Sequence, residues 1–547
     1  MELAPALSLS MAMSSWVATI VTLLIGVAVV SLRGRRRRTK ARLNLPPGPR
    51  GWPVFGSLGA LAGALPPHRA LAALAARHGP LMHLRLGSFD AVVASSAGAA
   101  RLVLKTHDAA FADRARTAAG ELVAYNYKGI VHTPYGAYWR MARKLCATEL
   151  FSPRRVDSYE RIRAEEIGAL ARDLFGRAGR AVAVRERLAS ATLRNILRMS
   201  VGDKWSGVYG SADGEAFRRT LDEAFEVSGA VSNVGEWVSL LGWLDVQGFR
   251  RRMKRLSKMY DRFLEQILHE HEASMAAAGD GGQPAAAACD LVDVLLQLSG
   301  EEEEGSAGAG ADSEARLTRD GVKAFILDII AGGTESSAVA MEWAMAELLR
   351  RPDAMAAATD ELDRVVGTAR WVTERDIPDL PYVDAVVKEA LRLHPVGPLL
   401  VPHHAMEDTV VAGGYVVPAG ARVLVNAWAI ARDPASWPDR PDAFLPERFL
   451  PGGGAAAAGL DVRGQHYELL PFGSGRRVCP ATNLAMKMVA LGVASLVQGF
   501  AWRLPDGVAA EDVSMEELVG LSTRRKVPLV AVAEPRLPAH LYAGTAA

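Results

Sequence analysis

This sequence of 547 residues contains the stretch Phe472-Gly473-Ser474-Gly475-Arg476-Arg477-Val478-Cys479-Pro480-Ala481. Its glycines permit tight backbone turns and a close approach to a flat ligand. Arg477 can neutralise a carboxylate, and Cys479 stands where an apolar helix is expected to begin. A thiolate there gains from the helix dipole and the unpaired backbone N–H groups, which predicts a lowered pKa for Cys479. A buried structural cysteine is the alternative interpretation, because lone thiols are usually buried.

Three motifs upstream bear on that choice. Glu389 and Arg392 lie at i,i+3 on one predicted helix face, a spacing that alone is typical of a surface ion pair. Arg448 offers a second guanidinium to a buried network. Trp139 and Arg143 place an indole N–H and a guanidinium one helical turn apart, a pair suited to holding a carboxylate. Alone, this last pair is equally typical of an amphipathic helix.

A long helix is predicted from a cap at Thr318 to about Arg351, ending before Pro352. It contains Ala331-Gly332-Gly333-Thr334-Glu335-Ser336-Ser337. Each glycine inside a helix costs about 1 kcal/mol relative to alanine, so the pair requires an explanation. A kink fitted to neighbouring packing is one explanation.

In this order and at these intervals, the motifs resemble the cytochrome P450 family over nearly the whole chain. The resemblance implies a haem cofactor (heme b, iron protoporphyrin IX) with Cys479 as the iron ligand. Phe472, Gly475 and Arg477 match the FxxGxRxCxG signature, whose last glycine is Ala481 here. Trp139 and Arg143 match a helix that contacts the haem propionates together with Arg477, and His403 stands where a further propionate contact often occurs. Glu389, Arg392 and Arg448 match the family's structural network.

The same resemblance explains the paired glycines, since the helix opens there to leave room for dioxygen. Glu335 and Ser336 match the acid–alcohol pair that relays protons. The usual threonine is Ser336 in this sequence, which keeps the hydroxyl but restricts its rotamer less. NADPH is implied only indirectly, through a separate NADPH–cytochrome P450 reductase. That reductase is expected to approach basic residues near the cysteine, such as Arg476 and Lys487.

The predicted fold is mainly α with small β-sheets, a cytochrome P450 fold behind an N-terminal transmembrane helix. Helical periodicity marks residues 160–174, 250–275, 320–350, 382–394 and 481–500, and strand-like pieces occur at 82–86, 91–94 and 422–426. Ala276–Ala288 and Glu301–Gly310 are low-complexity and predict a mobile surface loop. The neighbouring His269 and His271 are i,i+2 and point to different faces, so a surface helix is a better interpretation than a metal site.

The N-terminus predicts a membrane anchor. Residues 3–32 carry no charge, which is enough apolar helix to cross a bilayer, and seven basic residues follow at 33–42. This order favours a retained single-pass anchor with the body in the cytosol over a cleaved signal. The expected organisation is an anchor at 1–32, a basic and proline-rich hinge at 33–50, and a catalytic domain at 51–547. We expect an endoplasmic reticulum membrane protein, in contact with membrane lipid and monomeric.

Composition excludes other classes. The body without residues 1–42 has a net charge of −4, so nothing indicates a nucleic-acid partner. The three cysteines lack the CxxC spacing of zinc sites and cannot form a disulfide framework. A loose glycine cluster at Gly56–Gly63 lacks GxGxxG spacing, so the chain is not expected to bind a nicotinamide cofactor itself.

The substrate is expected to be a lipophilic small molecule. The likeness to the family places mostly apolar residues on the pocket wall: Phe325, Ile329, Ala331, Val396, Leu399 and Leu400. Stretches such as LDIIAGGTESSAV resemble plant microsomal enzymes, with the nearest likeness to the trimethyltridecatetraene (homoterpene) synthases of grasses. These oxidatively cleave geranyllinalool and (E)-nerolidol to trimethyltridecatetraene and dimethylnonatriene.

Other functions remain open at this point. Within the same family, a flavonoid 3'-hydroxylase or a brassinosteroid hydroxylase is the alternative. A haem-thiolate isomerase or dehydratase would need no reductase, but the presence of Glu335 and Ser336 disfavours it. A non-catalytic sterol- or haem-binding membrane protein would need no proton relay.

Overall fold

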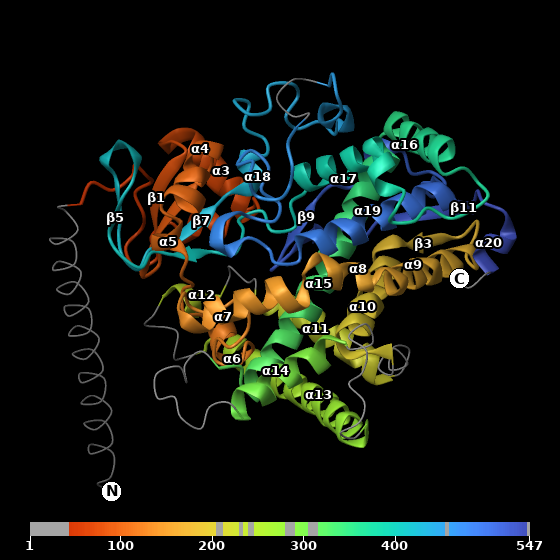
Figure 1. Ribbon diagram of the computed structural model, residues 1–547. Helices are drawn as coiled ribbons and strands as arrows, with labels where there is room; N and C mark the ends of the chain where they lie inside the picture. The colour runs from red at the N-terminus through yellow and green to blue at the C-terminus, as the bar shows by residue number, and fades with distance from the viewer. Residues whose placement is uncertain are drawn as a thin grey trace, which may run out of the picture.

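The computed structural model of the chain describes residues 43–203, 212–228, 233–238, 245–278, 290–304, 316–453 and 459–543. These residues form a mainly helical body with small sheets, as the sequence predicts (Figure 1). The predicted anchor at 1–32 and the basic cluster at 33–42 lie outside the described residues. The proline-rich part of the hinge lies against the first strand, where the His83 N–H donates to the Pro47 carbonyl (3.0 Å).

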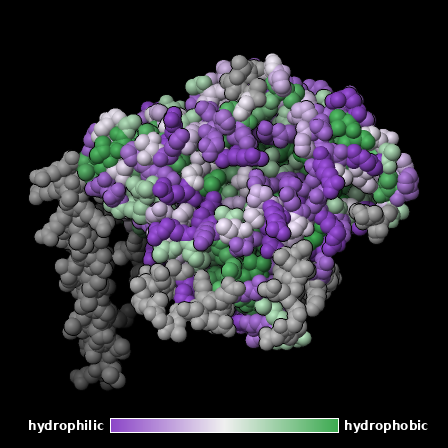
Figure 2. Space-filling view, viewed as in Figure 1, coloured by the Kyte–Doolittle hydropathy of each residue, from purple (hydrophilic) through white to green (hydrophobic). Residues whose placement is uncertain are grey.

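One long helix, α15 (Arg319–Arg350), runs through the middle of the body (Figure 1). The Thr318 side chain accepts a hydrogen bond from the Gly321 N–H (3.2 Å), so the predicted cap is confirmed. Among the described residues, α15 alone is long and apolar enough to cross a membrane, but 67% of its apolar window is buried. It is therefore the central helix of the core. The molecular surface on the side shown in Figure 2 is mostly hydrophilic.

The helices that pack most extensively against α15 are α10 (Val184–Val201), α17 (Pro381–Leu393) and α19 (Thr482–Gly499). The helices predicted at 160–174, 250–275, 320–350, 382–394 and 481–500 are confirmed to within a few residues as α9 (Glu160–Phe175), α13 (Phe249–Ala278), α15, α17 and α19. The other helices are α2 (Leu58–Leu61), α3 (Pro67–His78), α4 (Ala97–Arg101), α5 (Asp108–Phe111), α6 (Ala118–Leu122), α7 (Ala137–Leu145), α8 (Pro153–Ser158), α11 (Ala212–Ser228), α12 (Val234–Trp237), α14 (Leu291–Glu304), α16 (Pro352–Val365), α18 (Ala427–Ile430) and α20 (Ala539–Ala543).

The sheets join segments that are distant in the sequence. The largest has the order β1-β2-β7-β4, and β2 pairs in parallel with β7, with Ala91 opposite Arg422. Its strands are β1 (Leu81–Leu86), β2 (Phe89–Ala94), β7 (Arg422–Val425) and β4 (His403–His404). The others are β3 (Ala181–Ala183), β11 (Val530–Pro535) and β8 (Phe500–Arg503) in one sheet, β9 (Glu517–Val519) with β10 (Thr523–Arg525), and β5 (Thr409–Val410) with β6 (Val416–Val417).

The region around α13 and α14 corrects two expectations. Glu301–Glu304 end the helix α14 instead of beginning a loop, because buried leucines at 291 and 295 carry that helix forward. Residues 279–288 and 305–310 of the predicted loop lie outside the described residues, whereas Ala276–Ala278 belong to the end of α13. The exposed His269 and the buried His271 do face different ways, as predicted, but His271 is not on a surface face.

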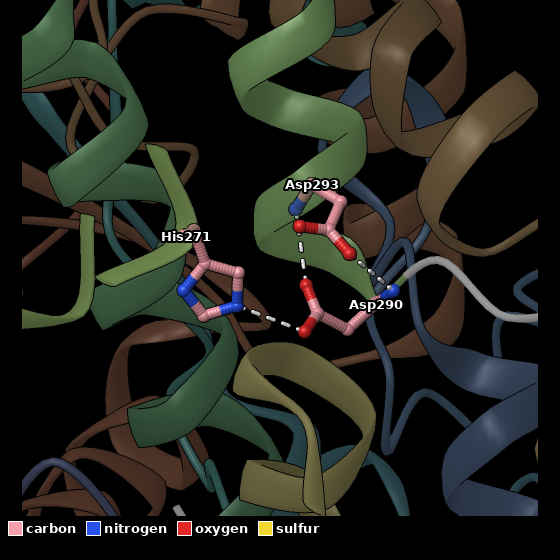
Figure 3. A group of neighbouring side chains, drawn as sticks. All are labelled: His271, Asp290 and Asp293. Carbon is pink, nitrogen blue, oxygen red and sulfur yellow. Dashed lines mark hydrogen bonds and ion pairs between the residues drawn. The ribbon is translucent and has the colours of Figure 1, made fainter. Parts of the chain in front are cut away.

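The side chain of His271 links α13 to the beginning of α14. Its Nε2 lies 2.9 Å from Asp290 Oδ2, and the side chains of His271, Asp290 and Asp293 turn toward one another (Figure 3). Asp290 Oδ1 accepts hydrogen bonds from the backbone N–H groups of Val292 and Asp293 (3.0 Å each), which caps α14. This cluster is explained by helix capping together with an ion pair between the two helices.

Candidate functional site

The loop before α19, residues 472–481, carries Cys479 and is the cysteine loop; it is built around a tight turn. The Cys479 N–H donates to the Phe472 carbonyl at 2.9 Å, which closes the loop on itself. Gly473 and Gly475 have φ of +71° and +70°, a region that favours glycine. A Cβ at Gly475 would lie 2.3 Å from the carbonyl oxygen of Leu104, so no larger residue fits there. The spacing of Phe472, Gly475 and Cys479 therefore follows from the geometry of this turn.

The surroundings of the Cys479 thiol act in opposite directions. Burial raises its pKa, whereas the Ala481 N–H, the charge of Arg143 and the Thr482 side chain lower it. Burial prevails and the pKa is raised, so the lowered pKa expected from the sequence is wrong for the free thiol. Since a coordinating metal deprotonates a thiol outright, these donors fit a thiolate held by a metal cation.

A cavity of about 380 Å³ lies between α15, α7 and this loop. Its wall gathers residues that the sequence places far apart, and among the predicted site residues it includes Trp139, Arg143, Ser336, His403, Phe472, Arg477 and Cys479. Gly475 supports the loop from outside the cavity. Of the apolar wall residues that were predicted, Ile329, Val396 and Leu400 line the cavity, whereas Phe325, Ala331 and Leu399 do not.

One N–H donor group of Arg477 has no hydrogen-bond partner among the described residues. Its Nε donates to the Ala112 carbonyl and its Nη2 to the Thr133 carbonyl, both at 2.7 Å, and the guanidinium lies 4.8 Å from the Trp139 ring. Its Nη1 is buried without a hydrogen-bond partner among the described residues. A buried unpaired donor on a cation is costly, so the group fits an anionic ligand such as a carboxylate.

Other basic groups lie around the same wall. Arg143 stands one helical turn after Trp139 on α7. His403 Nδ1 lies 3.0 Å from the Phe111 carbonyl, and burial together with the charge of Arg114 lowers the pKa of His403 to about 3. His403 is therefore neutral and donates from Nδ1 to that carbonyl, so its Nε2 would bond an anion only after protonation.

Arg114 is a wall residue that sequence reasoning missed. Its Nη1 donates to the carbonyls of Val401 and Pro402, at 2.7 Å each, and its Nε to the carbonyl of Val131. Burial, reinforced by the charge of Arg477, lowers the pKa of Arg114 to about 9. No spacing in the sequence marks this residue, because two of its three carbonyl partners belong to a segment nearly 290 residues away.

The two glycines of α15 have different roles. Gly332 lines the cavity, and apart from the adjacent backbone of its own helix and its two chain neighbours no atom lies within 4 Å of a Cβ placed there. A Cβ at Gly333 would instead lie 2.5 Å from Ile196 Cδ1, so this glycine also lets α10 approach. Gly332 therefore provides the space that the family resemblance predicts, and Gly333 fits the alternative explanation by packing. The helix α15 remains continuous through both glycines.

The predicted acid–alcohol pair is divided between two faces of α15. Ser336 lines the cavity, and its Oγ donates to the Gly332 carbonyl at 2.6 Å. Glu335 does not line the cavity, and its Oε1 lies 3.3 Å from Arg524 Nη1 on β10. Consecutive helical residues point about 100° apart, which explains the division.

Glu389, Arg392 and Arg448 form one buried network, as predicted. Arg392 binds both carboxylate oxygens of Glu389, at 2.7 and 2.8 Å, and neither residue is exposed to solvent. Arg448 Nε donates to Glu389 Oε1 at 3.0 Å. Three backbone carbonyls, of Ala431, Pro441 and Ala443, accept the remaining Arg392 donors, so α17 is tied to the segment before the cysteine loop.

Comparisons with known proteins agree with this geometry. The family model of cytochrome P450 matches residues 46–530. A trimethyltridecatetraene synthase of Zea mays is 74% identical over 97% of this chain and 95% of its own length, and a dimethylnonatriene synthase of Zea mays is 72% identical over the full length of both. A flavonoid 3'-monooxygenase of Arabidopsis thaliana is 41% identical over 94% of this chain and 96% of its own length.

Solved structures show the same fold. A zebrafish cytochrome P450 structure described with progesterone superposes with a TM-score of 0.71 at 27% identity, and covers 86% of this chain and all of the other. The family implies a haem-thiolate cofactor, a redox partner and a lipophilic substrate. The chain therefore belongs to the cytochrome P450 family and is a monooxygenase of that family.

Proposed function

We propose that this monooxygenase oxidatively cleaves the tertiary allylic alcohols geranyllinalool and (E)-nerolidol to trimethyltridecatetraene and dimethylnonatriene. The observation that carries the proposal is the identity of 74% and 72% to two enzymes with those product names, over nearly the whole chain. The flavonoid 3'-monooxygenase stands at 41%. The apolar side of the cavity, with Ile130, Ile196 and Phe225, suits a terpenoid chain.

Within this proposal, Cys479 ligates the haem iron, and Trp139, Arg143 and Arg477 hold the propionates. The unpaired Nη1 of Arg477 supports this assignment, since a propionate would supply its missing acceptor. His403 would join this set by donating from Nε2 once the imidazole is protonated. A thiolate-ligated haem, when bound, supplies the activation of dioxygen.

The hydroxyl of Ser336 supplies the local proton path. Its Oγ now donates to the Gly332 carbonyl, and rotation about the Cα–Cβ bond turns that hydroxyl into the cavity without moving the helix. Glu335, held by Arg524 on the adjoining face, would resupply the proton.

The proposed reaction balances with one dioxygen. In nerolidol the bond from the carbinol carbon to the neighbouring methylene breaks, and the carbinol oxygen loses its hydrogen to become a ketone. The released chain loses a second hydrogen as its new double bond forms. Those two hydrogens, two electrons from the reductase and two protons convert dioxygen to two waters. The residues of the chain therefore have to place the substrate and deliver protons.

The cellular setting follows the same proposal. Residues 1–32 would anchor the chain in the endoplasmic reticulum membrane, residues 33–50 would orient it, and residues 51–547 would form a monomeric, cytosolic catalytic domain. NADPH would act only through its reductase. A lipophilic substrate dissolved in that membrane would reach the cavity without crossing much water.

The decisive experiment is reconstitution of the full chain with a plant NADPH–cytochrome P450 reductase. Geranyllinalool, nerolidol, a flavonoid and a brassinosteroid are offered in parallel, and volatile and polar products are analysed. We expect the two homoterpenes, only with NADPH and reductase present. Turnover of the flavonoid or steroid alone would refute the homoterpene substrate, and turnover without reductase would indicate an isomerase or dehydratase.

A further inference from the structure

One acidic residue lines the cavity in the part of the chain that the structure describes, and the mechanism above does not use it. Asp328 lies on α15, four residues before Gly332 and therefore on the same face of the helix. The basic wall residues Arg143 and Arg477 lie near the cysteine loop and already have a role there. Asp328 instead stands beside Ile130, Val131 and Ile329.

The hydrogen bonds of Asp328 converge on one of its two oxygens. Oδ2 accepts from the backbone N–H groups of Ile130 and Val131, at 2.5 and 3.0 Å. A Cβ at Gly129 would lie 2.4 Å from the same oxygen, so this loop can approach only because Gly129 has no side chain. Neither of these two hydrogen bonds uses Oδ1, which leaves that oxygen for another donor.

The exposed part of Asp328 belongs to the wall of the cavity. The residue is only partly covered, and it contributes to the wall of the internal cavity. Burial raises its pKa to about 6, although the two backbone N–H groups lower it. At neutral pH the group is therefore a carboxylate in largely apolar surroundings, and such a group needs donors.

A tie to the 129–131 loop does not by itself explain this carboxylate. An asparagine would accept the same two backbone N–H groups through its carbonyl oxygen, without a buried charge. A ligand that brings a hydroxyl donor on an apolar chain would use the carboxylate, and would place its apolar part against Ile130 and Ile329.

We propose that Asp328 binds the hydroxyl group of the substrate and thereby places the carbinol carbon one helical turn from Gly332. Four residues of helix span about 6 Å, so a hydroxyl at Asp328 sets the bond to be cleaved near the open surface of Gly332. The inference rests on the proposed function, in which the substrate is a tertiary alcohol. Asp328 then selects an alcohol over the corresponding hydrocarbon and fixes which end of the chain is cleaved.

The test measures binding by the holoenzyme. Nerolidol and the sesquiterpene hydrocarbon of the same skeleton that lacks the hydroxyl are titrated, and the change of the haem absorbance gives both Kd values. The variants are Asp328→Asn, which keeps an acceptor for the Ile130 and Val131 N–H groups, and Asp328→Leu. Asp320→Asn, an exposed acid on the same helix outside the cavity, is the matched control.

We expect wild type and Asp320→Asn to prefer the alcohol. Both Asp328 variants should bind the alcohol about tenfold or more weakly, since each loses a hydrogen bond between the hydroxyl and a charged group. The affinity of Asp328→Asn for the hydrocarbon should stay within about twofold of the wild-type value. An equal loss for both ligands would show a purely structural role, and an unchanged preference for the alcohol would likewise overturn the proposal.

This outcome is separate from that of the proposed function. Turnover of nerolidol by wild type decides the proposed function, whereas the comparison of alcohol and hydrocarbon binding decides the role of Asp328. If wild type turned over neither alcohol, the two Kd values would still show whether Asp328 recognises a hydroxyl.

Discussion

At the scale of single residues, Cys479 shows which properties of a site residue the sequence spacing can predict. The spacing to Phe472 and Gly475 predicts the position of the thiol, because the turn that they form has few solutions. It does not predict the pKa, which depends on burial by segments from elsewhere in the chain. The same holds for Arg114 and Asp328, which no motif identifies and which each have hydrogen-bond partners that are distant in sequence.

Replacement of Cys479 by serine should remove the thiolate ligand. We expect Cys479→Ser to lose the carbon monoxide spectrum of a thiolate-ligated haem and its monooxygenase activity, because a hydroxyl at this position stays protonated. Cys146→Ala is the matched control, since Cys146 is buried in the apolar core and its pKa is raised to about 12. An unaltered spectrum in Cys479→Ser would contradict the assigned ligand.

Replacement of Ser336 by alanine should uncouple the reaction. The variant keeps the fold, because only the bond to the Gly332 carbonyl is lost, but it loses a hydroxyl in the cavity. We expect normal haem binding, NADPH consumption within about threefold of wild type, and at least about tenfold less product per NADPH. Ser336→Thr restores the hydroxyl and should restore coupling. Equal coupling in the alanine variant would refute the proton path.

At the scale of elements, the sequence predicts the helices well and their ends less well. Five helices are confirmed because apolar residues recur along the whole length of each of them, and in α15 they surround most of the helix. The acidic run Glu301–Glu304 predicts a loop because it has no apolar pattern, whereas in the structure it continues α14, whose earlier turns bury Leu291 and Leu295. Short strands such as β9 were not predicted, since three residues give too little pattern.

The network on α17 should be essential for stability. Glu389→Gln leaves the guanidinium groups of Arg392 and Arg448 without their carboxylate in a fully buried site. Breaking such a pair costs about 3–5 kcal/mol, so we expect a large fall in the denaturant midpoint and in the yield of folded holoprotein. Lys388→Gln, whose pair with Asp384 is partly exposed, should change the midpoint little.

An acidic pH should weaken the link between α3 and β9. Burial alone would raise the pKa of Glu517, but hydrogen bonds and charge from His68 and Arg69 hold it at about 2. Because the pKa is lower in the folded state, this link stabilises the fold above the ordinary glutamate pKa and is lost as pH falls toward 2. We expect Glu517→Gln to lower the unfolding free energy on the order of 2 kcal/mol at pH 7, and the difference from wild type to shrink between about pH 5 and pH 3. A difference independent of pH would contradict this prediction.

At the scale of the whole molecule, the N-terminal segment is distant in sequence from the residues that line the cavity. The described residues from 43 onward contain the cysteine loop, the cavity and the sheets. We expect removal of residues 2–42 to leave the haem spectrum unchanged and to release the protein from membranes in a fractionation experiment, because the only long uncharged N-terminal stretch is lost. A variant that keeps residues 2–42 but carries Cys479→Ser should stay in the membrane fraction. Retention of the shortened chain in membranes would show that the body has a second attachment.

The parallel pairing of β2 with β7 has a consequence for biosynthesis. Ala91 and Arg422 lie opposite each other although more than three hundred residues separate them. The edge of β2 therefore stays open on the ribosome until most of the chain has been translated, and such distant pairing closes slowly. During that interval we expect the nascent N-terminal half to expose an unpaired strand edge, and such an edge makes a folding intermediate prone to aggregate.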